Sequence, residues 1–330
     1  MEPPNIDQSL ILVLNYNGRE LLAECLPSIV EAGARAPGRC AVGVVDNGSI
    51  DGSLEYLSEC WPDVRLYQEP NRGLSSFNQV LARTNEDVVL LLNNDVKLDP
   101  VAVGPLLKTF RTAPDALFTA PQCWTFDGQT YEGMRTRVRM RFGLIQGLCR
   151  VPGHERHVGE PGLTAAAGPV LAVDRRKFLA LGGYDPLYLP GRIEDLDLGF
   201  RGWMAGWKGY YVPDSVAYHQ GAASFGPAFG DSGCDRLAWR NSLLFAWKNL
   251  SGGRWLGHLA WLPARVGQAL ASGHADVLIE AWKRLGPAWK SRKRQGVGRG
   301  EWNARQEAFF EAFGWNLADN VRMPAPVSDS

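Results

Sequence analysis

The sequence lacks several features that would place it in a class at once. Its 35 basic residues cancel its 35 acidic ones over 330 residues, so no overall field recruits nucleic acid. The six cysteines are scattered and include no Cys-x-x-Cys pair, which argues against a zinc site or a disulfide framework. No apolar run reaches the ~20 residues that a membrane-spanning helix needs, and residues 1–5 lack the start of a signal peptide. We expect a cytoplasmic protein, and peripheral attachment to the inner face of the cell membrane stays open.

The common phosphate-binding loops are also missing. No Gly-x-x-x-x-Gly-Lys-Ser/Thr occurs, and no Gly-x-Gly-x-x-Gly follows the first apolar run. The nearest glycine-rich match begins at Gly296, in a basic segment with no apolar run before it. Any nucleotide must therefore be held by another kind of site.

The first hundred residues contain a repeated pattern of strand and helix. Short apolar runs alternate with amphipathic segments four times, which is typical of a parallel sheet with right-handed helical crossovers. The predicted strands cover residues 9–14, 41–45, 64–67 and 87–92. The pattern predicts an α/β fold in which a ligand binds beyond the carboxyl ends of the strands.

Every predicted strand ends in polar residues. The four clusters are Asn15-Tyr16-Asn17, Asp46-Asn47, Asn71-Arg72 and Asn93-Asn94-Asp95. Turns are often polar, but four such clusters on one rim favour a ligand site. Tyr16 can stack on a base, Asp46 can accept hydrogen bonds from a base or ribose, and Arg72 can pair with phosphate. Since Asp95 and nearby amide oxygens can hold a hard cation, the mix predicts a nucleotide diphosphate site.

Three carboxylates fall within four positions at Glu194, Asp195 and Asp197, ahead of apolar residues at helical spacing. Acids are common at helix starts, and Asp197 can pair with Arg201 at i,i+4. A carboxylate in the first turn can instead take a proton from an attacking hydroxyl. The polar rim favours this second interpretation for Asp195. Glu194 is then a neighbour that tunes or orients it, and Asp197 is a structural brace.

Taken in order, these segments resemble the family 2 glycosyltransferases over about residues 8–250. The matching motifs are Asn15-Tyr16-Asn17, Val45-Asp46-Asn47-Gly48-Ser49-x-Asp51-Gly52-Ser53, Asn71-Arg72-Gly73, Leu92-Asn93-Asn94-Asp95, Gly182-Gly183-Tyr184-Asp185, Glu194-Asp195-Leu196-Asp197-x-x-x-Arg201 and Val216-Ala217-Tyr218-His219. The resemblance implies the GT-A fold, a Rossmann-like mixed α/β sheet flanked by helices. The GT-A domain would occupy residues 1–250, with a nucleotide-binding half at 8–130 and an acceptor half at 131–250. Residues 251–330 would form an amphipathic helical extension with a disordered end.

Within the family the chain looks most like bacterial rhamnosyltransferase-type enzymes of cell-surface polysaccharide synthesis. The implied activity is inverting transfer of a hexose from a nucleotide-diphosphate sugar, dTDP-rhamnose or a UDP-sugar, to a hydroxyl of a glycan or a polyprenyl-linked glycan. Two alternatives stay open. One is a non-catalytic nucleotide-sugar or glycan-binding protein on the same fold. The other is a sugar-phosphate nucleotidyltransferase, which would need a glycine-rich basic loop after the first strand.

The resemblance also implies a role for individual residues. Asp195 would be the catalytic base, and Asp95 with His219 would bind Mg²⁺ or Mn²⁺. The implied nucleotide-sugar contacts are Asn15, Tyr16, Asn17, Asp46, Asn47, Arg72, Asn93, Asn94 and Glu194. Two asparagines precede Asp95 where many family members have an aspartate, and neutral amides hold a cation less strongly than carboxylates do.

Residues 135–157 contain six arginines opposed by a single glutamate. Arg135, Arg137, Arg139 and Arg141 alternate with other side chains, a period of two that predicts one face of a strand. A solvated basic strand pair fits this pattern, and so does a loop that grips a phosphate-bearing acceptor. Residues 165–173 are predicted to form one further strand that leads into the site.

Six of the twelve tryptophans lie beyond residue 250. Leu278, Trp282, Leu285 and Trp289 fall on one helical stripe, and the basic residues between 283 and 299 have no acid among them. A helix of this kind suits an anionic membrane surface. A helical cap on the core or on a second subunit fits the pattern equally well.

Overall fold

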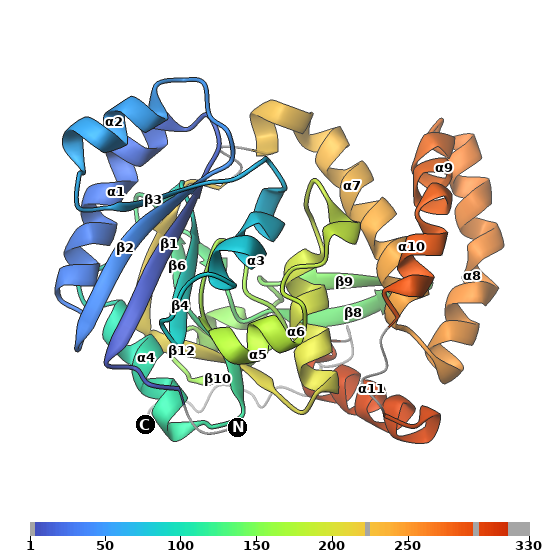
Figure 1. Cartoon of the computed structure of the whole chain (residues 1–330). Helices are drawn as coiled ribbons and strands as arrows, with labels where there is room; N and C mark the ends of the chain where they lie inside the picture. The colour runs from blue at the N-terminus through green and yellow to red at the C-terminus, as the bar shows by residue number, and fades with distance from the viewer. Residues whose placement is uncertain (1–3, 222–224, 293–296, 316–330) are drawn as a thin grey trace, which may run out of the picture.

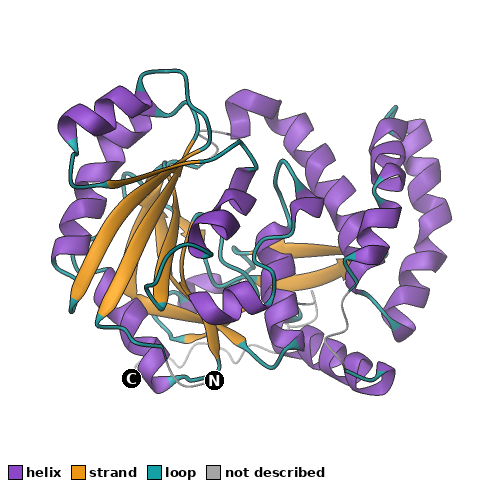
Figure 2. Ribbon diagram, in the orientation of Figure 1, coloured by secondary structure: helices purple, strands orange, loops and turns teal. Residues whose placement is uncertain are grey.

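The structure is a computed structural model and describes residues 4–221, 225–292 and 297–315 (Figure 1). Within these residues a ten-stranded mixed sheet is flanked by helices, and a group of helices from the C-terminal part lies beside it (Figure 2). The strand order is β10-β12-β6-β11-β4-β1-β2-β3, with β5 on β12 and β7 on β6.

The first part of the sheet follows the predicted alternation of strand and helix. β1 pairs in parallel with both β2 and β4, and β2 pairs in parallel with β3. The elements are β1 (Gln8–Asn15), α1 (Arg19–Ala34), β2 (Arg39–Asp46), α2 (Ser53–Cys60), β3 (Arg65–Gln68), η1 (Gly73–Ser75), α3 (Ser76–Leu81) and β4 (Val88–Asn93). The carboxyl ends of these strands therefore meet at one edge, as the sequence predicts.

The second part of the sheet is mixed. β11 lies antiparallel between β4 and β6, and β6 pairs in parallel with β12. The elements are β5 (Val96–Leu98), α4 (Val103–Thr112), β6 (Ala116–Thr125), β7 (Tyr131–Gly133), β10 (Gly162–Thr164), β11 (Val170–Asp174), α5 (Arg175–Ala180), η3 (Pro186–Tyr188), α6 (Glu194–Met204) and β12 (Lys208–His219). A separate hairpin, β8 (Arg137–Arg141) and β9 (Leu144–Leu148), is followed by η2 (His154–His157).

The predicted strand over residues 165–173 is confirmed from Val170 onward and is wrong for residues 165–169. β10 ends at Thr164 and β11 begins at Val170. The segment between them lies very close to helix α6. A Cβ placed on Gly199 would overlap the carbonyl oxygen of Ala165. The small side chains of this segment thus make room for the helix that carries the acid cluster.

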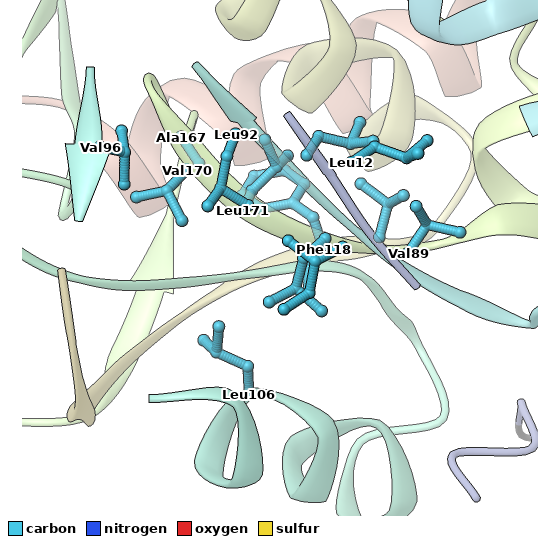
Figure 3. Packing of buried hydrophobic residues seen from close by; sticks show 14 of the residues in the cluster. Leu12, Val89, Leu92, Val96, Leu106, Phe118, Ala167, Val170 and Leu171 are labelled. Atoms are coloured by element: carbon cyan, nitrogen blue, oxygen red, sulfur yellow. The ribbon is translucent and has the colours of Figure 1, made fainter. Parts of the chain in front are cut away.

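The apolar core around the sheet combines strands and helix α4 (Figure 3). Leu12 of β1, Val89 of β4, Phe118 of β6 and Leu106 of α4 are all buried. Since the central strands are covered on both faces, their sequences are apolar almost to the last residue. In β1, β2 and β4 the interior positions are apolar, and the polar side chains lie near the strand ends.

The C-terminal helices share a second apolar cluster with α6. Phe200 of α6 packs edge-on against Phe245 of α7 and Phe309 of α11, at centroid distances of 5.3 and 5.0 Å. The helices are α7 (Phe225–Asn249), α8 (Gly252–Ala271), α9 (Ala275–Lys283), α10 (Leu285–Lys290) and α11 (Arg299–Phe313). The predicted boundary at residue 250 falls between α7 and α8, and the helices beyond it pack on α6 and α7 through this cluster.

The predicted tryptophan stripe is divided in the structure. The helix is interrupted at Arg284, between α9 and α10. Leu278 and Leu285 pack on the second cluster, whereas Trp282 and Trp289 are exposed. None of the helices that the structure describes has both the length and the hydropathy to span a bilayer. The end predicted to be disordered lies outside the described residues.

Candidate active site

The rim of the sheet joins three strand ends through one amide side chain. Asn15 ends β1 opposite Asp46 of β2, and its Nδ2 donates to Asp46 Oδ2 at 3.0 Å. Its Oδ1 accepts from Asn94 Nδ2 at 2.8 Å. All three side chains are buried. The structure thus brings together residues from three of the four predicted polar clusters.

The Asp46 carboxylate also shapes the loop that follows β2. Its Oδ1 accepts hydrogen bonds from the backbone N–H groups of Gly48 and Ser49, at 3.0 and 2.8 Å. Ser49 Oγ in turn accepts from the backbone N–H of Asn17 at 2.8 Å and from Asn15 Nδ2 at 3.1 Å. Ser49 is thus a site residue that the sequence reasoning included in a motif without giving it a role.

Asn47 and the loop after β3 lie against each other. Asn47 is 2% exposed, and its Nδ2 lies 3.4 Å from the carbonyl oxygen of Gly73. Its Oδ1 is buried and has no hydrogen-bond partner among the described residues. An unpaired buried amide oxygen is costly, so this atom is a candidate contact for a ligand donor.

The remaining rim residues are more open. Tyr16 is 52% exposed and Asn17 adopts a left-handed backbone with φ 48°. The Arg72 side chain is exposed and forms no hydrogen bond within the part of the chain that the structure describes. Asn93 ends β4, and its backbone N–H donates to Pro169 at 2.9 Å. Tyr16 and Arg72 therefore remain accessible beside the buried network.

The two predicted metal ligands, Asp95 and His219, meet across the sheet. His219 Nε2 lies 3.5 Å from Asp95 Oδ2, and His219 Nδ1 lies 2.6 Å from Glu132 Oε2. Burial lowers the pKa of His219, but hydrogen bonds and charge attraction from Asp95 and Glu132 outweigh it and raise that pKa. Glu132, on the short strand β7, was not predicted because it is 87 residues from His219.

These residues fit a divalent cation in the chemistry of their donor atoms. Asp95 is 2% exposed, and its Oδ1 is buried without a hydrogen-bond partner among the described residues. Carboxylate oxygen suits Mg²⁺ and Mn²⁺, which proteins commonly hold with one or two carboxylates and the phosphates of a substrate. No group of three or more His, Cys, Asp or Glu side chains that could hold a metal ion is found in the described part of the chain.

The acid cluster begins helix α6 after two left-handed residues, Arg192 and Ile193, with φ values of 77° and 74°. Burial, and then the charge of Asp195, raise the pKa of Glu194 to about 8. Burial also raises the pKa of Asp195, against the hydrogen bond that its carboxylate accepts from the backbone N–H of Leu196. Two neighbouring carboxyls therefore hold their protons to higher pH than usual, as acid–base residues often do.

Asp197 has the opposite character. Its carboxylate is fully buried and accepts hydrogen bonds from Tyr188, Arg201, Lys248 and Asn249. Burial would raise its pKa, but the charges of Lys248 and Arg201 hold the pKa well below its usual range. These contacts agree with the predicted brace, which extends beyond Arg201 to helix α7.

The polar rim and the acid helix adjoin each other. An added Cβ on Gly73, where φ is +51°, would lie 3.1 Å from the carbonyl oxygen of Pro190. Ser75 of η1 and Glu194 of α6 line the same small cavity. Asn78 Nδ2 donates to the Tyr184 carbonyl at 2.8 Å, and Asn78 Oδ1 accepts from the Tyr184 N–H at 2.9 Å. The loop after β3 is thus fixed against the segment that carries the acids.

The basic strand is directed mainly toward the protein. Arg137 donates to the carbonyl of Ala312 at 3.0 Å, and the Arg139 guanidinium lies 5.5 Å from the ring centre of Trp315. Arg135 precedes β8 and donates to the carbonyl of His157. The prediction that all four arginines share one strand face is therefore wrong for Arg135. Of the four, Arg141 is exposed and the other three are half-buried.

Known proteins match the part of the chain that contains the polar rim. The family described as "Glycosyl transferase family 2" matches residues 10–162, which include β1, β2, β4 and the polar rim. The N-acetylglucosaminyl-diphospho-decaprenol L-rhamnosyltransferase of Mycobacterium tuberculosis is 28% identical over 250 residues, covering 67% of this chain and 78% of that protein. Two strains of that organism give the same match.

Among solved structures, the crystal structure of GalNAc-T7 with UDP, GalNAc and Mn²⁺ has a TM-score of 0.52 at 19% identity. The match covers 72% of this chain and 50% of the other, so this chain spans about half the length of that structure. The mixed sheet flanked by helices has the GT-A fold of this glycosyltransferase neighbour. The family match over residues 10–162 and the rhamnosyltransferase relative support a family 2 glycosyltransferase. A binding protein without activity and a nucleotidyltransferase are not favoured.

Proposed function

We propose that this chain transfers a sugar from a nucleotide-diphosphate sugar to a hydroxyl of a polyprenyl-linked glycan, during synthesis of a cell-surface polysaccharide. The name of the M. tuberculosis relative supports this acceptor class and a rhamnosyl group. A dTDP-rhamnose donor fits that relative, and a UDP-sugar is the alternative donor. Our proposal for the donor and the acceptor rests on this similarity together with the chemistry of the site.

One observation carries the proposal more than any other. The loop that follows β3, part of the nucleotide-like rim, lies against the segment before α6, and Ser75 and Glu194 line one cavity. A donor on the rim would therefore have its sugar close to two carboxyls with raised pKa values. A glycosyl transfer needs these two parts side by side.

For the donor, we propose that Tyr16 stacks on the base and that Asp46 with Asn47 contacts the base or ribose. Arg72 would pair with the diphosphate. Asn15, Asn17, Asn93 and Asn94 would order the rim and supply further hydrogen bonds, and Glu194 would contact the sugar. The exposure of Tyr16 and Arg72 and the unpaired Asn47 Oδ1 support this assignment.

Asp95 and His219 are the residues that would hold a divalent cation. Such a cation would offset the negative charge that develops on the departing diphosphate. The buried, unpaired oxygen of Asp95 supports this placement. Glu132 would keep His219 oriented, because a second carboxylate that binds the far ring nitrogen fixes the imidazole of a metal ligand.

In the proposed reaction Asp195 accepts the proton of the acceptor hydroxyl. The hydroxyl oxygen attacks the anomeric carbon on the face opposite the nucleotide, and the bond to the diphosphate oxygen breaks with its electron pair leaving on the diphosphate. One displacement of this kind inverts the anomeric centre. The raised pKa of Asp195 favours proton transfer, since a base is most effective when its pKa approaches the working pH.

The test is an Asp195→Asn variant, assayed for transfer across a panel of nucleotide sugars with and without Mn²⁺. We expect donor binding to stay within about two-fold and transfer to fall by about 10²–10⁴-fold, the usual contribution of a general base. Asp63→Asn changes an exposed acid and should retain full transfer. Full activity of Asp195→Asn would exclude Asp195 as the base, and donor binding by the wild type without turnover would exclude an enzyme.

A further inference from the structure

Helix α8 is apolar on the face that it buries and also on the face that it exposes. Its inner face, which includes Trp255 and Leu262, packs on the second apolar cluster, and His258 and Ala269 are buried. Its outer face repeats every three or four residues through Leu256, Leu259, Pro263, Val266 and Leu270. A surface helix of a soluble protein normally presents a polar outer face. The apolar outer face of α8 is therefore a candidate binding surface.

The exposure of this outer face is large. Leu256 is 66% exposed and Leu270 is 65% exposed, and they lie near opposite ends of a helix of 20 residues. At 1.5 Å per residue the helix is about 30 Å long. The outer face is therefore an extended apolar stripe, and it is longer than a single ligand pocket.

The neighbouring helices α9 and α10 extend the exposed apolar surface. Ile279 is 54% exposed, Trp282 is 70% exposed and Trp289 is 52% exposed. Helix α8 adds Trp261, which is 44% exposed. In Figure 1 helices α8 and α9 lie side by side at the edge of the molecule farthest from β1–β3. We call the exposed apolar side chains of α8, α9 and α10 the outer helical face.

The charges around the outer helical face are mostly positive. Helices α8 and α9, Arg284 and α10 contain five basic residues and two acidic ones. The two acids, Asp276 and Glu280, each pair with a basic side chain, Arg236 and Lys283 respectively. Lys290 is exposed near Trp289. Cations beside an apolar surface match the phosphate groups and acyl chains of an anionic bilayer.

We propose that the outer helical face docks on the surface of an anionic lipid bilayer, with α8 lying in the plane of the interface. Exposed tryptophans suit the boundary between headgroups and acyl chains. Lysine is depleted from the cores of protein interfaces, so a face that combines tryptophan with lysine fits lipid better than a second copy of the chain. The absence of a spanning helix among the described residues is consistent with lying on the membrane.

Arg284 connects this face to the acid cluster. It lies two residues after the exposed Trp282, and its Nη1 donates to the carbonyls of Leu187 and Leu189, both at 2.9 Å. Arg240 of α7 also donates to Leu189. These carbonyls belong to the segment just before α6. A docked enzyme would therefore present its acid cluster close to the membrane, where a lipid-linked hydroxyl arrives. This step rests on the proposed function, whereas docking itself does not.

The experiment measures co-sedimentation of the full chain with vesicles of phosphatidylglycerol and phosphatidylcholine, and with vesicles of phosphatidylcholine alone. We expect the wild type to bind the anionic vesicles at least ten-fold more tightly. Leu270→Gln/Trp282→Gln should weaken this binding by ten-fold or more. Val101→Gln/Leu66→Gln changes two exposed apolar side chains on the sheet side of the molecule and should bind like the wild type. Lys283→Ala/Lys290→Ala should lose most of the preference for anionic vesicles.

Several results would overturn the proposal. Wild-type protein that binds neither vesicle contradicts it, and so does unchanged binding by Leu270→Gln/Trp282→Gln. A dimer that this variant converts to monomer, in the absence of vesicle binding, would assign the face to a second copy. If the variant fails to melt cooperatively, the lysine variant carries the test. Transfer to a short-chain, water-soluble acceptor is measured in parallel. If the wild type shows no transfer to this acceptor, the proposed function is refuted, and the vesicle-binding result is judged separately.

Discussion

The ammonium group of Lys248 lies 2.8 Å from both carboxylate oxygens of Asp197, and both side chains are buried. The same ammonium donates to Asp185 at 2.7 Å. Lys248 is near the end of α7, Asp197 is in the first turn of α6, and Asp185 belongs to the preceding turn. This ion pair therefore fixes the acid helix from a segment 51 residues away, and it gives a direct test of what holds the proposed base in place.

Replacing Asp197 with asparagine should destabilise the protein by about 3–5 kcal/mol, because it leaves Lys248 buried without its main counter-charge. Urea denaturation measures the change in the free energy of unfolding. The matched control is Glu31→Gln, which breaks an exposed i,i+4 pair with Arg35 and should cost no more than about 0.5 kcal/mol. Equal losses in the two variants would show that the buried network does not hold α6.

The same residue predicts the response to acid. Because the pKa of Asp197 is held well below its usual range, the unfolded chain takes up a proton before the folded chain does as pH falls. The stabilisation is complete above the ordinary carboxyl range and is lost as pH falls toward the folded-state pKa. Asp197→Asn should therefore flatten this part of the curve of unfolding free energy against pH.

Glu194 should act in the opposite direction. Its folded-state pKa is about 8 against an ordinary value of 4.5, so the folded chain keeps a proton that the unfolded chain has released. Stability should then decline as pH rises from about 4.5 to about 8. Glu194→Gln removes the titrating group. The unfolding free energy of the variant minus that of the wild type should therefore be larger at pH 8.5 than at pH 5.

Denaturation at the two pH values measures this gain. The exposed Glu55→Gln variant is the control and should track the wild type at both. If the unfolding free energy of Glu194→Gln also changes with pH in parallel with that of the wild type, Glu194 titrates normally. Its burial then does not favour the protonated form.

Glu132 should matter for the cation although it is not proposed as a ligand. Glu132→Gln removes the charged partner of His219 Nδ1, so the Mn²⁺ concentration for half-maximal transfer should rise about 10–100-fold. Glu160→Gln is a matched control, since Glu160 pairs with His157 Nδ1 at the same 2.6 Å on an exposed part of the chain. A normal Mn²⁺ requirement in Glu132→Gln would separate His219 from the cation.

The parallel strands of the first hundred residues were predictable because their signal is local. Residues of β1 and β4 are buried on both faces, so each appears in the sequence as a short apolar run that ends in a polar residue. Parallel pairing then places Asn15 and Asp46 side by side without further information. The class of the fold and the position of the rim follow from these patterns.

The segment at 165–169 shows where this reasoning stops. Its run of small residues contains Gly168-Pro169, a dipeptide that favours a break before β11 and that the prediction of one strand passed over. The sequence does not reveal what packs on this segment: Gly199 lets α6 approach the backbone of Ala165. A contact between residues 34 positions apart in the chain has no periodicity that the sequence could display.

The sequence by itself determined the alternation of strands and helices, the polar ends of the strands and the acids at the start of α6, because each depends on neighbouring residues. Only the tertiary structure decided how the pKa values of these acids differ. Burial raises the pKa values of Glu194 and Asp195, while Lys248 and Arg201 lower that of Asp197. Three carboxylates within four positions thus take two different electrostatic states, because pKa depends on which groups surround a carboxyl in space.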